Sequence, residues 1–510
     1  MNNVFGSIKT RRPGSNAFNL SHEKKLSLNM GSLIPILNQE VVPGDKFRVN
    51  SEILLRLSPM IAPMMHRVNV YTHYFFVPNR IIWDQWEDFI TGGPDGISEP
   101  VHPYLNINDA NKQYFEAKDL ADYLGAPVQS QTDEGVSTLK ISALPFRAYQ
   151  EIYSEYYRDQ NLSNPPVFAK GSGDCQADIG TLTYMRNRAW EKDYYTSCLP
   201  WAQRGGTVGI PVEFNYKDAA TVNPTQTTAH ALQAEANTGE ITVNSDNVGI
   251  ENLEEEGVTV DINDLRKSVR LQEWLELAAR GGSRYREQLQ AFFGVSGGDA
   301  RLQRPEYLGG GRQPVVISET LQTSATNTNA GAVDASIQGT MAGHGISVGK
   351  SNRFSKRFKE HGHIIGIMSV LPRTAYQQNL GREWTRFDKF DYYWPQFAQI
   401  GEQEVKTSEV YAEIRETQEN LDSVFGYQSR YAEYKYKQST VHGDFRTNLD
   451  YWHMGRQFDD VPVLNADFVM SDPTQRVFAV TDPAEHKLYC QVFNSVKAIR
   501  PMPYHNVPTL

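Results

Sequence analysis

The sequence has few cysteines and no long apolar segment, and each shortage excludes a class of protein. Its three cysteines form no C-x-x-C pair, so they predict neither a disulfide framework nor a zinc site. The longest largely apolar run, 364–371, is far shorter than the ~20 residues of a membrane helix. The amino terminus has no apolar signal core either. We therefore expect a protein made and used in soluble form in a reducing compartment, with no membrane insertion.

The chain also lacks an excess of basic residues. Its 510 residues include 50 Lys and Arg against 60 Asp and Glu, which gives a formal net charge of −10. An acidic protein is a poor candidate for neutralising nucleic acid over its whole surface, so any such contact must be local. Hydrophobic residues make up 40% of the chain and aromatic residues 11%, which predicts a sizeable core and wide packed surfaces.

Two long runs of alternating side chains, 45–57 and 68–78, dominate the predicted fold. Apolar residues share one parity in each run, as Phe47 and Ile53 do in the first. A period of two places one apolar face of a strand against a core. Two prolines in the connection, 58–63, mark a turn. We therefore expect the two strands to pair with each other in a large antiparallel sandwich.

Further elements are expected along the rest of the chain. Helical spacing and turn residues predict helices at 79–91 with Asn79 as the N-cap, near 118–124, at 145–159, at 261–281 and at 284–293. Apolar and alternating runs predict strands at 364–371 and 488–496. Strands at both ends of the chain, with long excursions between them, are typical of a sandwich with elaborated loops.

Composition divides the chain into an arm and one elaborated domain. Residues 1–44 are expected to form an amino-terminal arm, basic over 1–25, and a first strand region. Residues 45–510 are expected to form a single domain with insertions. Within it, 213–260 is rich in Ala, Thr, Asn, Gly and Glu and is a candidate surface protrusion, and 261–294 is a helical insertion. A weaker change of the same kind in amino-acid composition spans 318–345.

Two basic segments are candidate nucleic-acid contacts. The residues concerned are Lys9, Arg11, Arg12, Arg353, Lys356 and Arg357. The first three lie in the arm and can follow phosphates, although a terminus that wraps a neighbouring subunit fits them equally well. The last three alternate with Phe354 and Phe358, a composition that grips single-stranded nucleic acid by phosphate pairing and base stacking. A charged contact between subunits is the alternative interpretation.

Other constellations give weaker signals. His361 and His363 have no spaced partners that complete a metal site. The acids at 388–404 could offer a carboxylate pair for glycoside hydrolysis, but 60 acids guarantee such clusters. The helices at 261–293 could be taken for a helix-turn-helix reader of duplex DNA. No nucleophile motif is present, and we predict no enzyme activity, no metal and no cofactor.

Several long stretches resemble one protein family in order along nearly the whole chain. They are Asp193–Trp201, Phe293–Val295, Asp299–Gly310, Glu360–Gly362, Tyr393–Phe397, Phe425–Gln428, Arg430–Tyr434 and Arg500–Pro503. In these stretches the chain resembles the major capsid protein of microviruses, small single-stranded DNA bacteriophages, in their gokushovirus-like branch. The first long strands lie where that family begins its sandwich.

The resemblance implies a mainly β fold, an eight-stranded antiparallel jelly-roll sandwich of the viral capsid type with large loop and helical insertions. It implies sixty copies in a T=1 icosahedral shell around circular single-stranded DNA, found in the virion capsid and assembled in the bacterial host cytoplasm. The implied partners are an internal scaffolding protein, a pilot protein and a small basic DNA-associated protein. Related shells carry an insertion that builds threefold spikes thought to meet a host surface receptor, and 213–260 is the matching candidate here.

Two rival functions remain open from the sequence. A jelly-roll carbohydrate-binding protein or glycoside hydrolase would use the same architecture and would stay a monomer or small oligomer. A sequence-specific reader of duplex DNA would bind DNA tightly as an isolated protein. In the capsid interpretation, Trp201, Tyr307, Trp394 and Phe397 are candidate anchors of subunit contacts, because Trp and Tyr are enriched at interface hot spots.

Overall fold

A computed structural model describes most of the chain. The described residues are 14–128, 138–206, 303–323, 338–351 and 353–505, with residue 291, the helix 262–281 and four short strands between 221 and 251. The chain forms two compact units, one made of 1–200 with 297–510 and the other of 201–296. No helix among the described residues is long and apolar enough to cross a membrane.

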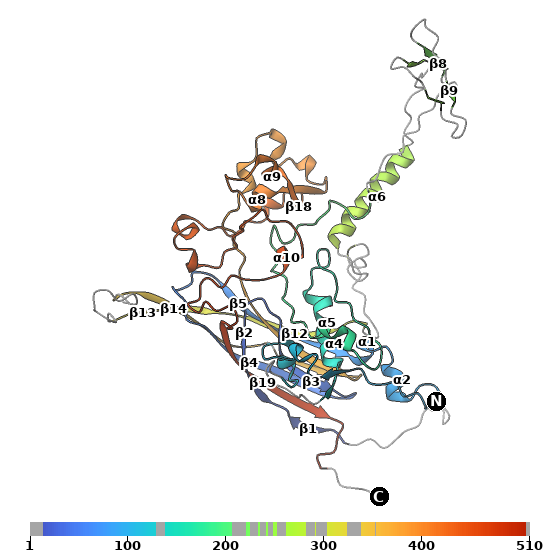
Figure 1. Cartoon of the computed structure of the whole chain (residues 1–510), viewed down its shortest axis with the longest axis vertical. Coiled ribbons are helices and arrows are strands. Elements are labelled where there is room, and N and C mark those ends of the chain that lie inside the picture. Colours follow the sequence, from blue (N-terminus) through green and yellow to red (C-terminus); the bar gives the residue numbers. More distant parts are fainter. Residues whose placement is uncertain are drawn as a thin grey trace. The chain divides into compact units, whose positions relative to one another are not determined.

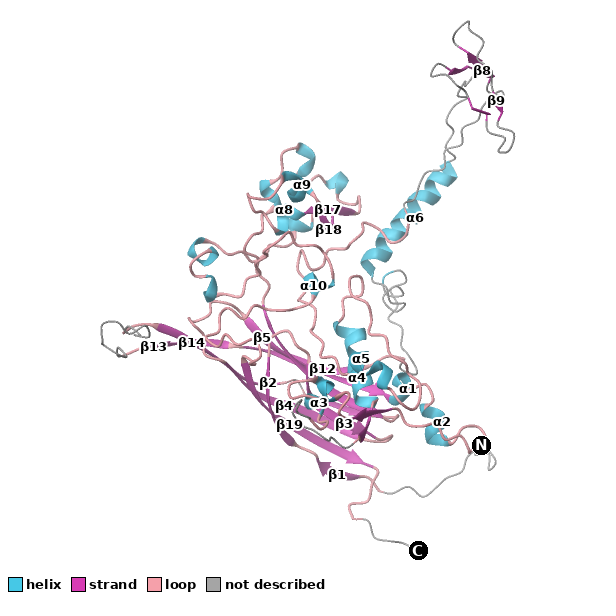
Figure 2. Cartoon of the chain, in the orientation of Figure 1, coloured by secondary structure: helices cyan, strands magenta, loops and turns pink. Residues whose placement is uncertain are grey.

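The larger unit is built on two large antiparallel sheets, one of seven strands and one of four (Figures 1 and 2). The seven-stranded sheet has the order β1 (Asn16–Asn19), β19 (Leu488–Arg500), β4 (Lys46–Leu57), β14 (Met341–Lys350), β13 (Val316–Leu321), with β2 (His22–Leu28) paired to β19 and β15 (Phe354–Arg357) paired to β4. The four-stranded sheet has the order β12 (Glu306–Pro314), β5 (Val68–Pro78), β16 (Gly362–Pro372), β3 (Ile34–Val41). The fold is therefore mainly β, as predicted, and its central strands are long.

The main core lies between the two sheets. The apolar parity of β4, including Phe47 and Ile53, is buried as its alternation predicted. Phe47 packs in one cluster with Tyr74 of β5 and Val496 of β19, and Ile53 packs in another with Val70 of β5. Both clusters combine residues of the two sheets, so the sandwich predicted from the two long strands is present.

The two long strands are not partners of each other, which corrects the predicted pairing. β4 lies between β19 and β14, and β5 lies between β12 and β16. The connection between β4 and β5 passes from one sheet to the other, and its Met60 forms bridges to Gly343 and Phe478. Alternation shows that a strand has one apolar face, but it does not identify the neighbouring strand.

A layer of short helices covers the other face of the four-stranded sheet. It contains α1 (Asn79–Ile82), α2 (Trp86–Thr91), α3 (Leu120–Leu124), α4 (Leu144–Ile152) and α5 (Ile179–Leu182), with the hairpin β6 (Tyr104–Ile107) and β7 (Leu139–Ser142). Phe75 and Val77 of β5 pack there with Trp83 and Tyr149. The four-stranded sheet is thus buried on both faces, whereas the seven-stranded sheet has one face in the core and one face exposed.

The helix predicted at 79–91 is broken in two. Its first turn ends at Trp83, which is extended, fully buried and donates its indole N–H to Ser172 Oγ at 2.8 Å. Asn79 is not the N-cap as predicted, because the helix starts at Asn79 with Pro78 before it. Burial of the large indole therefore overrides helical spacing. The helix predicted at 145–159 is present as α4 followed by a π-helical turn, Tyr153–Tyr157.

A second cluster of elements in the larger unit follows the sandwich strands. It contains β17 (Glu402–Lys406) paired with β18 (Val424–Ser429), and the helices α8 (Thr407–Val410), α9 (Gln418–Asp422) and α10 (Ala466–Val469). Their core joins Tyr194 and Tyr195 to Tyr376 and Val405. The motif at 193–201 that carried part of the family resemblance is therefore a packing element here.

The amino-terminal arm is shorter than expected. Residues 16–28 are not a basic arm, because β1 and β2 pair in register with β19. Lys24 on β2 is largely buried and its ammonium contacts the carbonyl oxygens of Pro35 and Tyr123. The arm interpretation therefore applies at most to 1–13, which lie outside the described residues.

The described residues of the smaller unit form one long helix, α6 (Ile262–Gly281), and two strand pairs. The pairs are β8 (Thr221–Pro224) with β11 (Val248–Glu251), and β9 (Gln233–Ala234) with β10 (Ile241–Thr242). The predicted helix at 261–281 is present, whereas the one at 284–293 lies outside the described residues except for residue 291. The predicted protrusion at 213–260 is described only at these short strands.

Candidate nucleic-acid interface

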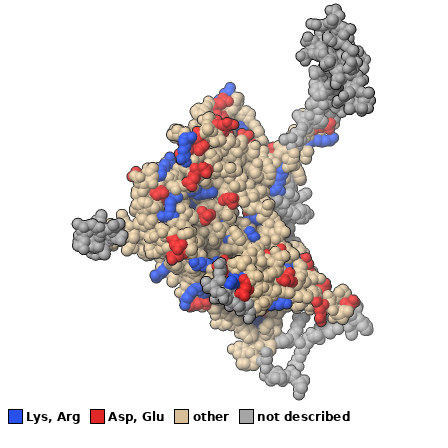
Figure 3. Space-filling view, viewed as in Figure 1, with Lys and Arg blue, Asp and Glu red and all other residues tan. Residues whose placement is uncertain are grey.

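The exposed face of the seven-stranded sheet carries an excess of basic side chains. Alternate positions of β2, β4, β14, β15 and β19 point away from the core, so each strand contributes one row to this face. The charged residues in these rows are Lys25, Lys46, Arg48, Arg56, Lys350, Arg357 and Lys497 against Glu23 and Glu52. The face is thus basic although the chain as a whole is acidic. On the view of Figure 3, by contrast, basic and acidic side chains of the larger unit are interspersed.

Four of these residues, Lys46, Arg48, Arg357 and Lys497, form a cluster that we call the basic cluster. The strand register places Arg48 directly opposite Lys497, and Lys46 directly opposite Arg357. Side chains opposite each other in an antiparallel sheet have Cβ atoms about 4.5–5.5 Å apart, and like charges in such positions destabilise the sheet. None of the four forms an ion pair with any other described residue. The cluster therefore lowers subunit stability and offers an uncompensated site for polyanions.

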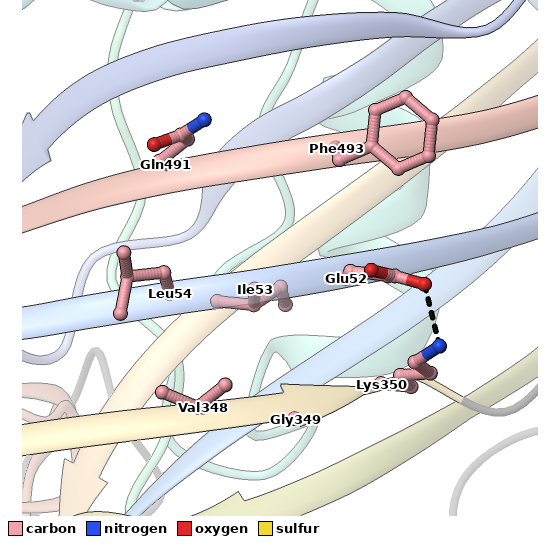
Figure 4. A pocket seen from close by; sticks show the side chains of 8 residues that line it. All are labelled: Glu52, Ile53, Leu54, Val348, Gly349, Lys350, Gln491 and Phe493. Atoms are coloured by element: carbon pink, nitrogen blue, oxygen red, sulfur yellow. Dashed lines mark ion pairs between the residues drawn. The ribbon is translucent and has the colours of Figure 1, made fainter.

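Beside the basic cluster the same face carries a shallow hollow of about 270 Å³ (Figure 4). Its side chains come from the three neighbouring strands β4, β14 and β19. Lys350 Nζ and Glu52 Oε1 form an ion pair at 2.7 Å at one end. Phe493 and, further along β19, Tyr489 are 37% and 47% exposed. Cations and exposed aromatic rings on one face are the combination that binds single-stranded nucleic acid.

The structure separates the predicted basic residues at 353–359. Arg353 and Arg357 are exposed, and Arg357 joins the basic cluster. Lys356 has the opposite parity, pairs with Glu306 on β12, and burial lowers the pKa of its ammonium. Strand alternation therefore places Lys356 on the opposite side of β15 from Arg357.

The predicted stacking role of Phe354 and Phe358 is wrong. Their exposed fractions are only 6% and 2%, because both lie in the sandwich core with Phe47 and Phe76. Their alternation with basic residues reflects one strand with an apolar face inward and a basic face outward. The predicted contacts Lys9, Arg11 and Arg12 lie outside the described residues.

Sequence reasoning missed Lys46, Arg48 and Lys497 as site residues. Each occurs in an alternating strand, where a lone cation looks like an ordinary solvated position. The signal appears only with the register, which joins residues about 450 positions apart in the chain. A period-two pattern therefore identified the correct face of β4 but not the basic cluster on it.

Two of the acids considered for glycoside hydrolysis, Asp388 and Asp391, have structural partners. Asp388 and Asp391 form a capping box in the turn Lys389–Asp391, where each carboxylate accepts a backbone N–H. Among the described residues, no three His, Cys, Asp or Glu side chains are placed to hold a metal ion. Hydrogen bonds within the turn account for the geometry of these two acids.

Comparison with known proteins gives one consistent result. Residues 6–510 match the model of the family described as capsid protein (F protein). The chain is 34% identical to capsid protein VP1 of Chlamydia phage 1 over 601 aligned positions, covering 100% of this chain and 98% of that protein. It is 34% identical to capsid protein VP1 of Bdellovibrio phage phiMH2K, with coverage of 99% and 97%. It is 29% identical to capsid protein VP1 of Spiroplasma virus 4, with coverage of 99% and 97%.

These matches confirm the predicted resemblance to microvirus capsid proteins and the prediction of a major capsid protein of a bacteriophage. They give no support to the carbohydrate-binding or glycoside-hydrolase alternative. Because the family model spans nearly the entire sequence, the chain belongs to the capsid protein (F protein) family.

Proposed function

We propose that this chain is the subunit of a sixty-copy, T=1 icosahedral shell around a circular single-stranded DNA genome, and that the exposed face of its seven-stranded sheet contacts the DNA. The basic cluster carries this proposal. Four like charges held in register on an acidic protein are unfavourable without an anionic partner. A phosphate backbone supplies that partner, and the cations of the cluster release its counterions on binding.

Within the sandwich we propose an eight-stranded jelly roll. One sheet would be formed by β2, β19, β4 and β14, and the other by β3, β16, β5 and β12. The observed strand orders of both sheets support this set. The chain order also supports it, because successive strands of the set pass repeatedly from one sheet to the other, as in a double Greek key.

The negative net charge of the chain supports a role for a separate basic protein in the virion. A shell subunit with a net charge of −10 cannot condense a genome alone, so we propose a small basic DNA-associated protein as a partner. An internal scaffolding protein and a pilot protein complete the proposed set, with assembly in the bacterial cytoplasm. We assign 213–260 the role of a surface protrusion that meets a host receptor, and Lys9, Arg11 and Arg12 that of an accessory DNA contact.

The double substitution Arg48→Ala with Lys497→Ala tests the DNA-facing surface. Full-length protein is titrated with a fluorescent single-stranded oligonucleotide at several salt concentrations. Loss of two phosphate contacts lowers the slope of log affinity against log salt by about 1.4, since each contact to a single strand contributes about 0.7. Subunit stability stays equal or rises by about 0.2–1 kcal/mol, because a repulsive cross-strand pair is removed.

Lys350→Ala is the matched control, because it removes a cation of the same face that is already paired with Glu52. We expect a smaller change in slope for this variant. An unchanged affinity and slope for the double variant would overturn the assignment of this face to DNA.

A further inference from the structure

A second hollow, of about 560 Å³, lies at one end of the four-stranded sheet, where β5 begins and β16 ends. Residues 65–67 and 373–375, which directly precede β5 and follow β16, form one side of it. Residues 439–442, Phe445 and His453 form the other. No Asp or Glu lines this hollow, whereas two Arg and three His do. Its volume falls in the range of about 300–1,000 Å³ that is typical of small-molecule sites.

Hydrogen bonds hold the walls of this hollow in place. His66 Nε2 lies 2.6 Å from the carbonyl oxygen of Arg373, and the backbone N–H of Arg373 donates to the carbonyl oxygen of Arg67 at 2.8 Å. On the facing side, His453 Nε2 lies 2.8 Å from the carbonyl oxygen of Phe445, and its Nδ1 accepts from the backbone N–H of Gly455 at 2.9 Å. The lining is therefore preformed, which reduces the entropy lost on binding.

The hollow has a positive electrostatic character. Burial, with smaller contributions from the nearby His453 and Arg476, lowers the pKa of His66 from 6.5 to about 4, so this imidazole is neutral at pH 7. Positive charge then comes from Arg67 and Arg373, two of the lining residues, and from Arg476, whose guanidinium lies 3.3 Å from Nδ1 of His453. Among the described residues, the ion pairs of these cations are long, with Glu191 3.8 Å from Arg373 and Asp450 3.9 Å from Arg476. An anion is the ligand favoured by this field.

The lining is partly apolar, which favours a ligand that has both an anionic group and an apolar part. Met65, Ala375, Val441 and Phe445 contribute apolar surface to the same hollow. Inorganic phosphate would use only the cationic part and would leave the rest of a hollow of this size unfilled. A ligand with a phosphate at one end and a flat, weakly polar ring at the other would use both parts, since aromatic walls bind bases by stacking.

We propose that this hollow binds one nucleoside phosphate, with the phosphate held by Arg67 and Arg373 and the base packed against the apolar wall around Phe445. The site is separate in its residues from the basic cluster and shares no side chain with it. The nucleotide arrives either free or as one unit of a single strand, and the two sources are distinguished by titration with a mononucleotide and with an oligonucleotide.

The experiment uses purified full-length protein and calorimetric titration with dAMP, with inorganic phosphate and with a short oligodeoxyadenylate. The test variants are Arg67→Ala and Arg373→Ala, both at exposed side chains whose backbone groups keep their hydrogen bonds. Arg266→Ala is the matched control, because Arg266 is exposed on α6 in the other compact unit. Arg48→Ala with Lys497→Ala is included to separate this site from the sheet face.

We expect saturable dAMP binding that weakens at least tenfold in Arg67→Ala and in Arg373→Ala, and that is unchanged in Arg266→Ala and in the Arg48/Lys497 double variant. Tighter binding of the oligonucleotide than of dAMP, with the same arginine dependence, identifies a strand as the source. Equal affinity for inorganic phosphate and dAMP would overturn the nucleotide assignment. Absence of saturable dAMP binding, or wild-type affinity in both arginine variants, would overturn the site, whereas loss of binding only in the double variant would assign the nucleotide to the sheet face.

Discussion

At the scale of single residues, Gly310 shows why the family-like motif 299–310 ends in a glycine. A Cβ at this position of β12 would lie 2.3 Å from the carbonyl oxygen of Thr72 and 2.7 Å from Cδ2 of His73. Both distances are shorter than side-chain carbons tolerate, and the Thr72 oxygen belongs to the backbone of the neighbouring strand β5. The absence of a side chain is therefore a requirement of close strand packing.

Gly310→Ala is expected to destabilise the subunit by about 1–3 kcal/mol, the usual cost of overpacking a filled site. Urea unfolding of unassembled protein measures the change. Gly171→Ala is the control, because nothing lies within 4 Å of the added Cβ there, and we expect a change within about 0.5 kcal/mol. Equal unfolding midpoints for the two variants would contradict this account of Gly310.

His73, on the helix-covered side of β5, is a second residue with a measurable consequence. Its Nδ1 lies 2.7 Å from the hydroxyl of Tyr157, which donates to it when the ring is neutral. Burial lowers the pKa of His73 from 6.5 to about 4, with Arg188 as a second cause. The His73 side chain therefore binds a proton at a higher pH in the unfolded chain than in the folded chain. Its contribution to the free energy of unfolding is complete above pH 6.5 and is lost as the pH falls toward 4.

We expect the free energy of unfolding to fall between pH 6.5 and 4, and His73→Gln to reduce the slope of that fall. A single group of this kind contributes up to about 1.4 kcal/mol per pH unit. Chemical denaturation at a series of pH values gives the slope for both proteins. Some slope remains in the variant, because burial also lowers the pKa of His66 and His363 to about 4. Identical slopes in the two proteins would rule out His73 as a contributor.

At the scale of elements, the sequence predicted which segments are strands better than it predicted their neighbours. Alternation located β4 almost to the residue, because a strand with one buried face must repeat with a period of two. The run 68–78 matches β5 equally closely, although β5 is buried on both faces. The pairing of β4 with β19, by contrast, joins distant segments and leaves no local trace. The apolar residues of β5 on both parities, such as Phe75 and Phe76, reflect the helical layer on its second face.

Strand pairing, which has no local sequence signal, also explains why the candidate site was only partly predicted. Basic residues at 353–357 were found because they are adjacent in sequence, yet strand parity sends Lys356 inward and leaves Arg357 outward. Arg48 and Lys497 were overlooked because only the register brings them together. A site built across strands is therefore predictable from the sequence only in its parts, and the structure is needed to assemble them.

At the scale of the whole molecule, the larger unit exposes an aromatic surface that no other described residue covers. The segment 384–394 carries six large aromatic side chains that are 45–92% exposed, namely Trp384, Phe387, Phe390, Tyr392, Tyr393 and Trp394. The segment is nevertheless held firmly, by the capping box of Asp388 and Asp391 and by an ion pair at 3.1 Å between Arg386 and Glu433, whose side chains are about nine-tenths buried. Apolar patches of this kind mark protein–protein contacts.

Because a capsid protein assembles with further copies of itself, we expect such copies to cover this exposed aromatic segment. Trp394, proposed from the sequence as a contact anchor, belongs to it and is 45% exposed. Tyr307, proposed in the same way, is 48% exposed on β12, with its ring near Phe75 and His73. Preorganisation of such a segment lowers the conformational entropy lost when copies associate. Since a few anchor side chains supply most of the binding free energy of an interface, these residues can determine whether the shell closes.

Trp384→Ser with Phe387→Ser is expected to leave subunit stability within about 0.5 kcal/mol, because both rings are mostly exposed before assembly. The same change should abolish or strongly reduce closed particles, since it removes two candidate interface anchors. Sedimentation and negative-stain imaging measure particle yield after co-expression with the proposed scaffolding, pilot and small basic proteins. Val167→Ser is the control for loss of an exposed apolar side chain elsewhere, at 81% exposure. Normal particle yield in the double variant would show that 384–394 is not a contact between copies, whereas stable free subunits without particles would establish that it is one.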